Sequence, residues 1–188
     1  MKYISLDLPL KGERKYIHGT SIIDSLQDAF DLNNLKSLSM LDIKFHLLAF
    51  KSICLKDHIL SDDRKIATLN FDNHDLQPQS FYFVEETKKP QKKILYPEEI
   101  IISDSQTDVA AQKIYFSNIN CHNFSVIEII VALTKELHKN VFTIEAGFQW
   151  VFARFQSSKW PIPQPSENIL VKIQQCFGTK LTKSQVYY

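Results

Sequence analysis

The chain has 188 residues, of which 44% are hydrophobic and 23% charged, a composition typical of a globular protein rather than a disordered chain. The 22 basic and 21 acidic residues leave a formal net charge of +1, so no overall field attracts nucleic acid or an anionic membrane. Three widely spaced cysteines argue against a disulfide framework and a structural zinc site, and no apolar run approaches the roughly 20 residues of a membrane span. We therefore expect a cytoplasmic protein without a bound metal.

The first half of the chain predicts one helix among several strands. The helix covers residues 20–30, where Thr20 or Ser21 can cap the first turn and apolar residues recur at helical spacing. A slip in the polar and apolar alternation near residues 48–49 indicates a bulge or a sharp bend. Alternating polarity predicts four strands in this half, at residues 2–9, 41–47, 65–71 and 81–86.

A lysine-rich stretch at residues 88–93 is the clearest boundary in the sequence. It holds one proline and four lysines and has no apolar residue apart from that proline. This stretch predicts a division into two units, residues 1–90 and residues 91–188. A solvated linker is the expected role of the stretch, and docking of an acidic carrier protein or of a coenzyme A phosphate is the alternative.

The second half predicts a second helix at residues 124–138. This helix carries almost no polar residue before Thr134, so we expect it to be central and buried. A helix that begins near residue 166 is the alternative for the third strand expected in this half. Four strands and one extended segment are expected around the helix, at residues 99–103, 141–155, 169–177, 181–188 and 113–119.

The two halves share one spacing. Each predicted helix follows a histidine, and a carboxylate lies six positions after that histidine, as in His18 with Asp24 and His122 with Glu128. Residues 41–45 of the first half also match residues 142–146 of the second half in pattern. We therefore predict two copies of one α+β unit, each with an antiparallel sheet curled around one central helix.

This order of elements resembles the hotdog fold, in which an antiparallel sheet curls around a long helix. The segment Tyr16-Ile17-His18-Gly19-Thr20, with Asp24 or Asp28 after it, looks like the His-Gly-helix-Asp segment of hotdog thioesterases. Residues 126–130 are similar to the acid-bearing helix of hotdog dehydratases. The resemblance implies two tandem hotdog units that act on acyl thioesters of coenzyme A or acyl carrier protein, by dehydration or hydrolysis. It implies no cofactor.

The resemblance also implies the site residues. A helix N-terminus suits a thioester oxygen that gains negative charge, and a histidine and a carboxylate beside it can transfer protons. Four residues are expected to be catalytic: His18, Asp24, His122 and Glu128. Four are expected to contact the substrate, mostly as walls of an acyl tunnel: Gly19, Phe45, Phe148 and Trp150.

A non-catalytic homologue is the alternative function. On this reading the four polar residues cap and solvate helix ends, and the protein binds an acyl chain, an acyl carrier protein or a partner subunit. The first half lacks the second glycine that usually follows His-Gly in the thioesterases, and the second half lacks the Phe-Pro-Gly context of the dehydratases. Exposed sheet edges make a homo-oligomer the expected assembly, without nucleic acid or membrane.

Overall fold

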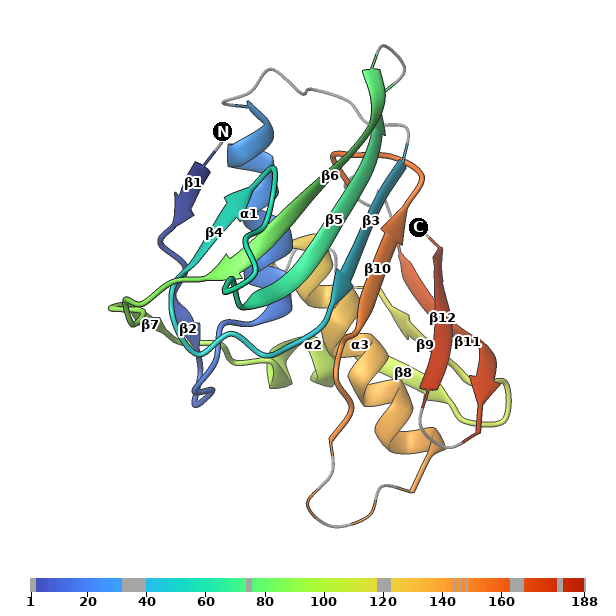
Figure 1. Ribbon diagram of the computed structural model, residues 1–188. Coiled ribbons are helices and arrows are strands. Elements are labelled where there is room, and N and C mark those ends of the chain that lie inside the picture. Colours follow the sequence, from blue (N-terminus) through green and yellow to red (C-terminus); the bar gives the residue numbers. More distant parts are fainter. Residues whose placement is uncertain are drawn as a thin grey trace. The chain divides into compact units, whose positions relative to one another are not determined.

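The computed structural model describes residues 3–31, 40–73, 76–117, 123–143, 145, 147, 149–162, 168–178 and 181–187. The chain forms two compact units, one of Met1–Tyr96 with Phe152–Pro163 and one of Pro97–Val151 with Gln164–Tyr188. Three helices and mostly antiparallel strands make up the described residues, so the fold is α+β (Figure 1). The predicted division into 1–90 and 91–188 assigns residues 152–163 to the second unit, whereas here they belong to the first.

The first unit contains a six-stranded antiparallel sheet with the order β1-β4-β6-β5-β3-β10. The four strands predicted in this half are confirmed, although β6 begins five residues before the predicted start. The strands are β1 (Tyr3–Leu6), β3 (Met40–Phe45), β4 (Ile53–Lys56), β5 (Lys65–Asn73), β6 (Leu76–Glu85) and β10 (Arg154–Ser157).

Strand β10 lies at one edge of the sheet, and in the sequence it follows residues 97–151 of the second unit. Arg154 binds Asp42 of β3 through two hydrogen bonds, from Nε to Oδ1 and from Nη2 to Oδ2, each 2.8 Å long. Asp42 is buried, and a buried carboxylate needs such a partner. The backbone N–H of Phe45 also donates to the carbonyl of Ala153 at 2.9 Å. The strand therefore both extends the sheet and neutralises a buried charge.

The slip in alternation near residues 48–49 marks a connection between two strands. Strand β3 ends at Phe45, and the chain then turns before β4. Ala49 is buried, and its carbonyl accepts a hydrogen bond from the N–H of Ile17 at 2.8 Å, whereas Leu47 and Phe50 are exposed. The predicted bend is confirmed, and it lies between strands rather than within one.

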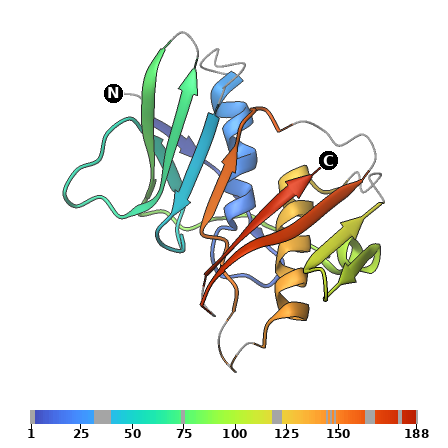
Figure 2. The same cartoon turned by 90° about the vertical axis from the view of Figure 1, so that its right-hand side faces the viewer.

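Helix α1 (Gly19–Asp31) confirms the helix predicted at residues 20–30. The helix begins where the N–H groups of Ser21 and Ile22 donate to the carbonyl of His18, at 3.0 and 3.4 Å. Figures 1 and 2 show α1 along one face of the six-stranded sheet. Ile22, Ile23 and Leu26 are fully buried, so the apolar stripe of the helix contributes to the core of this unit.

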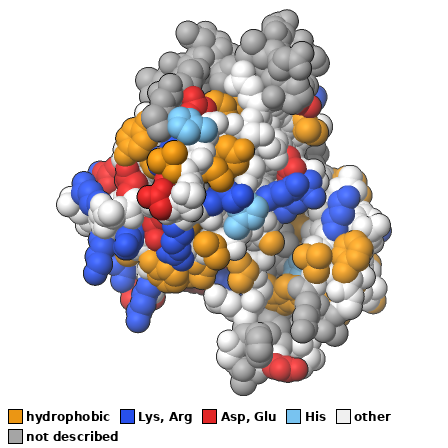
Figure 3. Space-filling view, viewed as in Figure 1, with side chains coloured by type: hydrophobic (Ala, Val, Ile, Leu, Met, Phe, Trp, Pro, Cys, Tyr) orange, Lys and Arg blue, Asp and Glu red, His pale blue; other side chains and the backbone are white. Residues whose placement is uncertain are grey.

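The lysine-rich stretch at residues 88–93 leads into a short parallel strand pair, β2 (Leu10–Lys11) with β7 (Lys93–Ile94). Basic side chains gather at the side of the molecule where β7 lies (Figure 3). Two of these lysines have acidic partners: Lys92 binds Asp7 at 2.8 Å, and Lys93 binds Glu13 at 3.0 Å. The end of the predicted linker is therefore fastened to the first unit.

The second unit contains a four-stranded antiparallel sheet and two helices. The sheet has the order β12-β11-β9-β8, and α3 (Val126–Val141) packs against β8, β9 and β11 (Figure 2). Leu133 and Leu137 of α3 are fully buried, as the apolar sequence of this helix predicts. The other elements are α2 (Glu99–Ser103), β8 (Ser105–Asp108), β9 (Lys113–Phe116), β11 (Ile169–Phe177) and β12 (Leu181–Tyr187).

Two strands predicted in this unit are wrong. Residues 99–103 form helix α2, because Pro97 and the acidic residues after it favour a helix start. Residues 141–155 were expected to form one long strand that matches β3, but of the described residues in this range only 154 and 155 are in a strand. Gly147 has a φ of 89°, which interrupts an extended chain. The strands predicted at 169–177 and 181–188 are confirmed.

Candidate functional site

His18 lies immediately before α1, as predicted, and is held there by its neighbours. Its Nδ1 lies 2.8 Å from Oγ1 of Thr20. Its ring packs against Tyr96 with centroids 5.8 Å apart. Tyr96 is the last residue of the first unit before the chain enters the second. The position of His18 is therefore fixed both by a hydroxyl in its own helix and by an aromatic ring from residue 96.

Lys11 of β2 also belongs to this arrangement, although no pattern in the sequence predicts it. It is only 5% exposed, and its ammonium donates a hydrogen bond of 3.1 Å to Oγ1 of Thr20. The same ammonium lies 4.0 Å from a carboxylate oxygen of Asp24 and 5.5 Å from the centroid of the Tyr96 ring. We call Lys11, His18, Thr20, Asp24 and Tyr96 the α1 cluster.

An apolar wall adjoins the α1 cluster at Gly19. A Cβ atom on Gly19 would lie 3.3 Å from the Phe45 ring and 3.5 Å from the Phe152 ring, tighter than or close to the limit of ordinary contact. The two rings pack together with centroids 5.7 Å apart. The structure therefore places Phe45 and Phe152 against Gly19, the residue that follows His18. Because one long strand was expected at 141–155, the contact of Phe152 with Phe45 was not predicted.

The start of α1 combines a helix N-terminus with a buried lysine that is paired with Asp24. No acidic residue lies in its first turn, so the helix N–H groups are not screened by a local carboxylate. Asp24 lies later in the helix, and its side chain is 36% exposed. The buried ammonium of Lys11 lies beside Thr20, and the Asp24 carboxylate 4.0 Å away compensates part of its charge. An oxygen that gains negative charge would be stabilised there.

In the second predicted pair, His122 with Glu128, the carboxylate has a structural role. Glu128 and Ser125 form a capping box at the start of α3. The N–H of Ser125 donates to Oε2 of Glu128 at 2.8 Å, and the N–H of Glu128 donates to Oγ of Ser125 at 3.2 Å. The spacing Ser-x-x-Glu is the sequence signature of this motif and was visible in the chain. His122 lies outside the described residues, so the pair itself is not seen.

Trp150 lies in the second unit, near the C-terminal end of α3. Its ring packs against His138, at 4.7 Å between centroids, and against Phe142, at 5.4 Å. Phe45 belongs to the first unit, so these two predicted tunnel walls are in separate units. Phe148 lies outside the described residues.

His138 is the buried histidine of the second unit. Its Nδ1 donates to the carbonyl of Thr134 at 2.5 Å, and its Nε2 contacts Oγ1 of Thr182 in β12. Burial lowers the pKa of His138, and the Thr134 carbonyl opposes that shift only in part. The imidazole is therefore held neutral, with the proton on Nδ1 and the Thr182 hydroxyl donating to Nε2.

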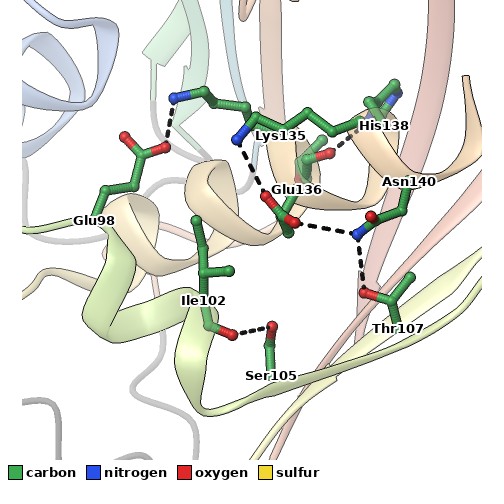
Figure 4. Close-up of polar contacts among 10 residues, drawn as sticks. Glu98, Ile102, Ser105, Thr107, Lys135, Glu136, His138 and Asn140 are labelled. Atoms are coloured by element: carbon green, nitrogen blue, oxygen red, sulfur yellow. Dashed lines mark hydrogen bonds and ion pairs between the residues drawn. The ribbon is translucent and has the colours of Figure 1, made fainter. Parts of the chain in front are cut away.

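The remaining polar contacts of α3 are structural. Figure 4 shows Lys135 paired with Glu98 of the residues before α2, at 2.5 Å, and Asn140 bonded to Thr107 of β8, at 3.5 Å. Glu136 of the same helix accepts a hydrogen bond from Asn140 at 3.2 Å. These contacts fasten α2 and β8 to the exposed side of α3.

Neither a metal-binding cluster nor a membrane-spanning helix is present in the described part of the chain. It contains no group of three or more His, Cys, Asp or Glu side chains placed to hold a metal ion. It also contains no helix that is both long enough and apolar enough to cross a membrane. Cys54, which is buried, and Cys176, which is exposed, are free thiols.

Comparison with known proteins gave no relative. No protein-family model, no curated protein and no solved structure matches this chain.

Proposed function

We propose that the protein acts on acyl thioesters of coenzyme A or acyl carrier protein, by hydrolysis or dehydration, at the start of α1. The observation that carries the proposal is the direct contact of His18 and the buried Lys11 with one hydroxyl, that of Thr20, at a helix N-terminus. A buried ammonium beside a helix start favours an oxyanion, and the rings of Phe45 and Phe152 offer apolar contact to an acyl chain.

The chemistry follows from these positions. The thioester carbonyl oxygen would lie at the start of α1 and gain negative charge as the carbonyl carbon is attacked. In hydrolysis, Asp24 accepts a proton from the attacking water, the C–S bond breaks and the sulfur leaves as a thiolate that takes up a proton. In dehydration, the same carboxylate removes the proton next to the carbonyl and returns it to the β-hydroxyl, whose C–O bond breaks so that it leaves as water.

At the level of the fold, we propose two tandem hotdog units. The support is that each unit packs a helix of at least 13 residues with an antiparallel sheet. A cytoplasmic location accords with the free thiols of Cys54 and Cys176. The lysines at 88–93 are proposed as the contact to the acidic carrier, although Lys92 and Lys93 already have acidic partners.

A non-catalytic binding protein is the second candidate, and the capping box favours it. In the second unit, the carboxylate expected to do chemistry is instead bonded to the backbone of Ser125. In that case the acyl thioester binds at the start of α1 and is not converted.

Turnover measurements distinguish the proposed enzyme from the non-catalytic binding protein. We expect the purified protein to convert acyl-CoA or acyl carrier protein substrates, and His18→Ala and Asp24→Asn each to lower kcat about 100-fold or more. His58→Ala, which changes an exposed histidine of the same unit, is the matched control. Saturable binding of an acyl thioester without turnover would support the binding protein, and neither binding nor turnover would refute both.

A further inference from the structure

The four-stranded sheet of the second unit has two different faces. Helix α3 covers one of them (Figure 2), where Ile114 is fully buried and Thr182 of β12 contacts His138 of the helix. Successive side chains of a strand point to opposite faces, so the residues that alternate with these point away from α3. Among them, Tyr115 is 40% exposed and Tyr187 is 43% exposed. We call the face that carries these two rings the outer face.

The strand register aligns the two rings in one row across the sheet. Tyr115 of β9 pairs with Leu170 of β11, and Leu170 pairs with Tyr187 of β12. Gln106 of β8 pairs with Tyr115 and ends the row. An open basin of about 720 Å³ lies on this row, and polar residues beside the row complete the part of its lining that concerns us: Asp104, Ser117 and Asn168.

Lysines follow the aromatic row on the same face. Lys113 pairs with Lys172 in the next row, and Lys183 lies farther along β12. Lys113 lies 5.2 Å from the centroid of the Tyr115 ring, and its ammonium lies 3.8 Å from a carboxylate oxygen of Asp108. Lys172 and Lys183 are exposed, and neither forms an ion pair with a residue that the structure describes. The outer face therefore combines rings with uncompensated positive charge.

Rings beside lysines suit a nucleobase and its phosphate. Every base has a flat π face that stacks on a tyrosine, and an ammonium binds the phosphate. The amides of Gln106 and Asn168 can both donate to and accept from the edge of a base. A free small molecule depends on an enclosed pocket, which this basin does not provide. A strand that crosses several rows gains contacts at each of them, so the open face favours a polymer.

We propose that the outer face binds single-stranded nucleic acid, with bases stacked on Tyr115 and Tyr187 and phosphates on Lys172 and Lys183. The net charge of +1 gives the chain no long-range attraction for such a partner, and for that reason the sequence predicts none. Stacking and a few phosphate contacts need only a local arrangement of side chains. The proposal is independent of the thioester chemistry at the start of α1.

The test is fluorescence anisotropy of the full-length protein with labelled single strands of about ten nucleotides at about 50 mM salt. RNA and DNA strands should both bind saturably, because stacking does not use the 2′-hydroxyl. A duplex of the same sequence should bind more weakly, because its bases are already stacked on one another. No binding of either strand, or equal binding of strand and duplex, would overturn the proposal.

Substitutions locate the binding on the outer face. Tyr115→Ala and Tyr187→Ala should each weaken binding about 5- to 100-fold, whereas Tyr115→Phe keeps a ring and should bind as the wild type does. Lys172→Gln should lower the slope of log K against log salt by about 0.7, the contribution of one phosphate contact on a single strand. Tyr3→Ala in the first unit and Lys139→Gln on α3 change exposed residues elsewhere and are the matched controls.

Unchanged binding in folded Tyr115→Ala and Tyr187→Ala would contradict the proposal, as would an equal loss in Tyr3→Ala. The comparison of strand with duplex uses the wild-type protein, so it holds even if a variant does not fold. Thioester turnover is measured separately, so failure of the proposed function is seen apart from failure of nucleic-acid binding.

Discussion

The starts of α1 and α3 share a sequence spacing and differ in their chemistry. In each case a histidine precedes the helix in the sequence, and a carboxylate within the helix lies six positions after that histidine. At α3 the carboxylate of Glu128 bonds to the backbone of Ser125, three residues away. At α1 no acid lies in the first turn, and Thr20 instead connects His18 to Lys11 of another strand. A capping box is complete within four residues, whereas the α1 cluster exists only in the folded unit.

The difference indicates which of the two helix starts the proposed chemistry would use. A carboxylate in the first turn compensates the helix dipole and satisfies backbone donors, so little is left for an anion. A buried lysine at the other helix start does the opposite and adds positive charge. We therefore assign the proposed chemistry to the first unit and a structural role to Glu128.

Of the substitutions that test the contrast between the two helix starts, Thr20→Val should have the largest effect on stability. The substitution leaves the buried ammonium of Lys11 without its hydroxyl acceptor, so we expect the free energy of unfolding to fall by about 1–3 kcal/mol. Chemical denaturation followed by circular dichroism measures this, and Thr20→Ser is the matched control. A loss no greater in Thr20→Val than in Thr20→Ser would mean that the hydroxyl does not support Lys11.

Ser125→Ala probes the other helix start, with a smaller expected effect. It removes the side-chain acceptor for the N–H of Glu128 and should cost about 1 kcal/mol of unfolding free energy. Ser125→Thr is the control that keeps the acceptor. Hydrogen exchange of α3 amides should show the loss, and the same measurement on α1 should not.

Glu128→Gln sharpens the assignment of roles. Glutamine can still accept a hydrogen bond from the N–H of Ser125, so only the charge–dipole contribution, about 0.3–1 kcal/mol, is lost. We expect thioester turnover to persist in this variant. Its abolition in a folded protein would return Glu128 to the catalytic residues and remove the contrast between the two helices.

His138 of the second unit should contribute a graded pH effect to stability. The folded pKa of His138 is lowered by burial, below the unfolded value of about 6.5. The contribution is constant above pH 6.5, and it is lost as the pH falls because the unfolded state takes up a proton that the folded state resists. Denaturation between pH 5 and 8 should show this loss, and His138→Gln should reduce it. An unchanged slope in His138→Gln would assign the effect to another group.

Periodicity was sufficient for both long helices and for most strands, because their apolar faces repeat at fixed intervals. It failed at 99–103, where three consecutive isoleucines follow Pro97 and two acids and form a helix. It failed again after α3, where alternation alone suggested a strand although Gly147 interrupts the chain. Alternation reports which side chains are apolar and does not report whether a neighbouring strand is present.

The candidate site was only half predictable. His18, Gly19 and Asp24 stand in a recognisable local order, and the side chains at the helix start follow from it. Lys11 and Tyr96 do not, because the pairing of β2 with β7 joins segments more than 80 residues apart. A lysine within a charged run looks solvated in sequence, and only the tertiary pairing buries it.

The strand β10 has a consequence for how the protein is made. A ribosome synthesises residues 1–96 first, but the sheet of that unit gains its last strand only when residues 154–157 emerge. Until then β3 is an open edge, and Asp42 lacks the arginine that neutralises it. The nascent chain therefore exposes an unpaired, aggregation-prone strand edge during most of the synthesis of its second half.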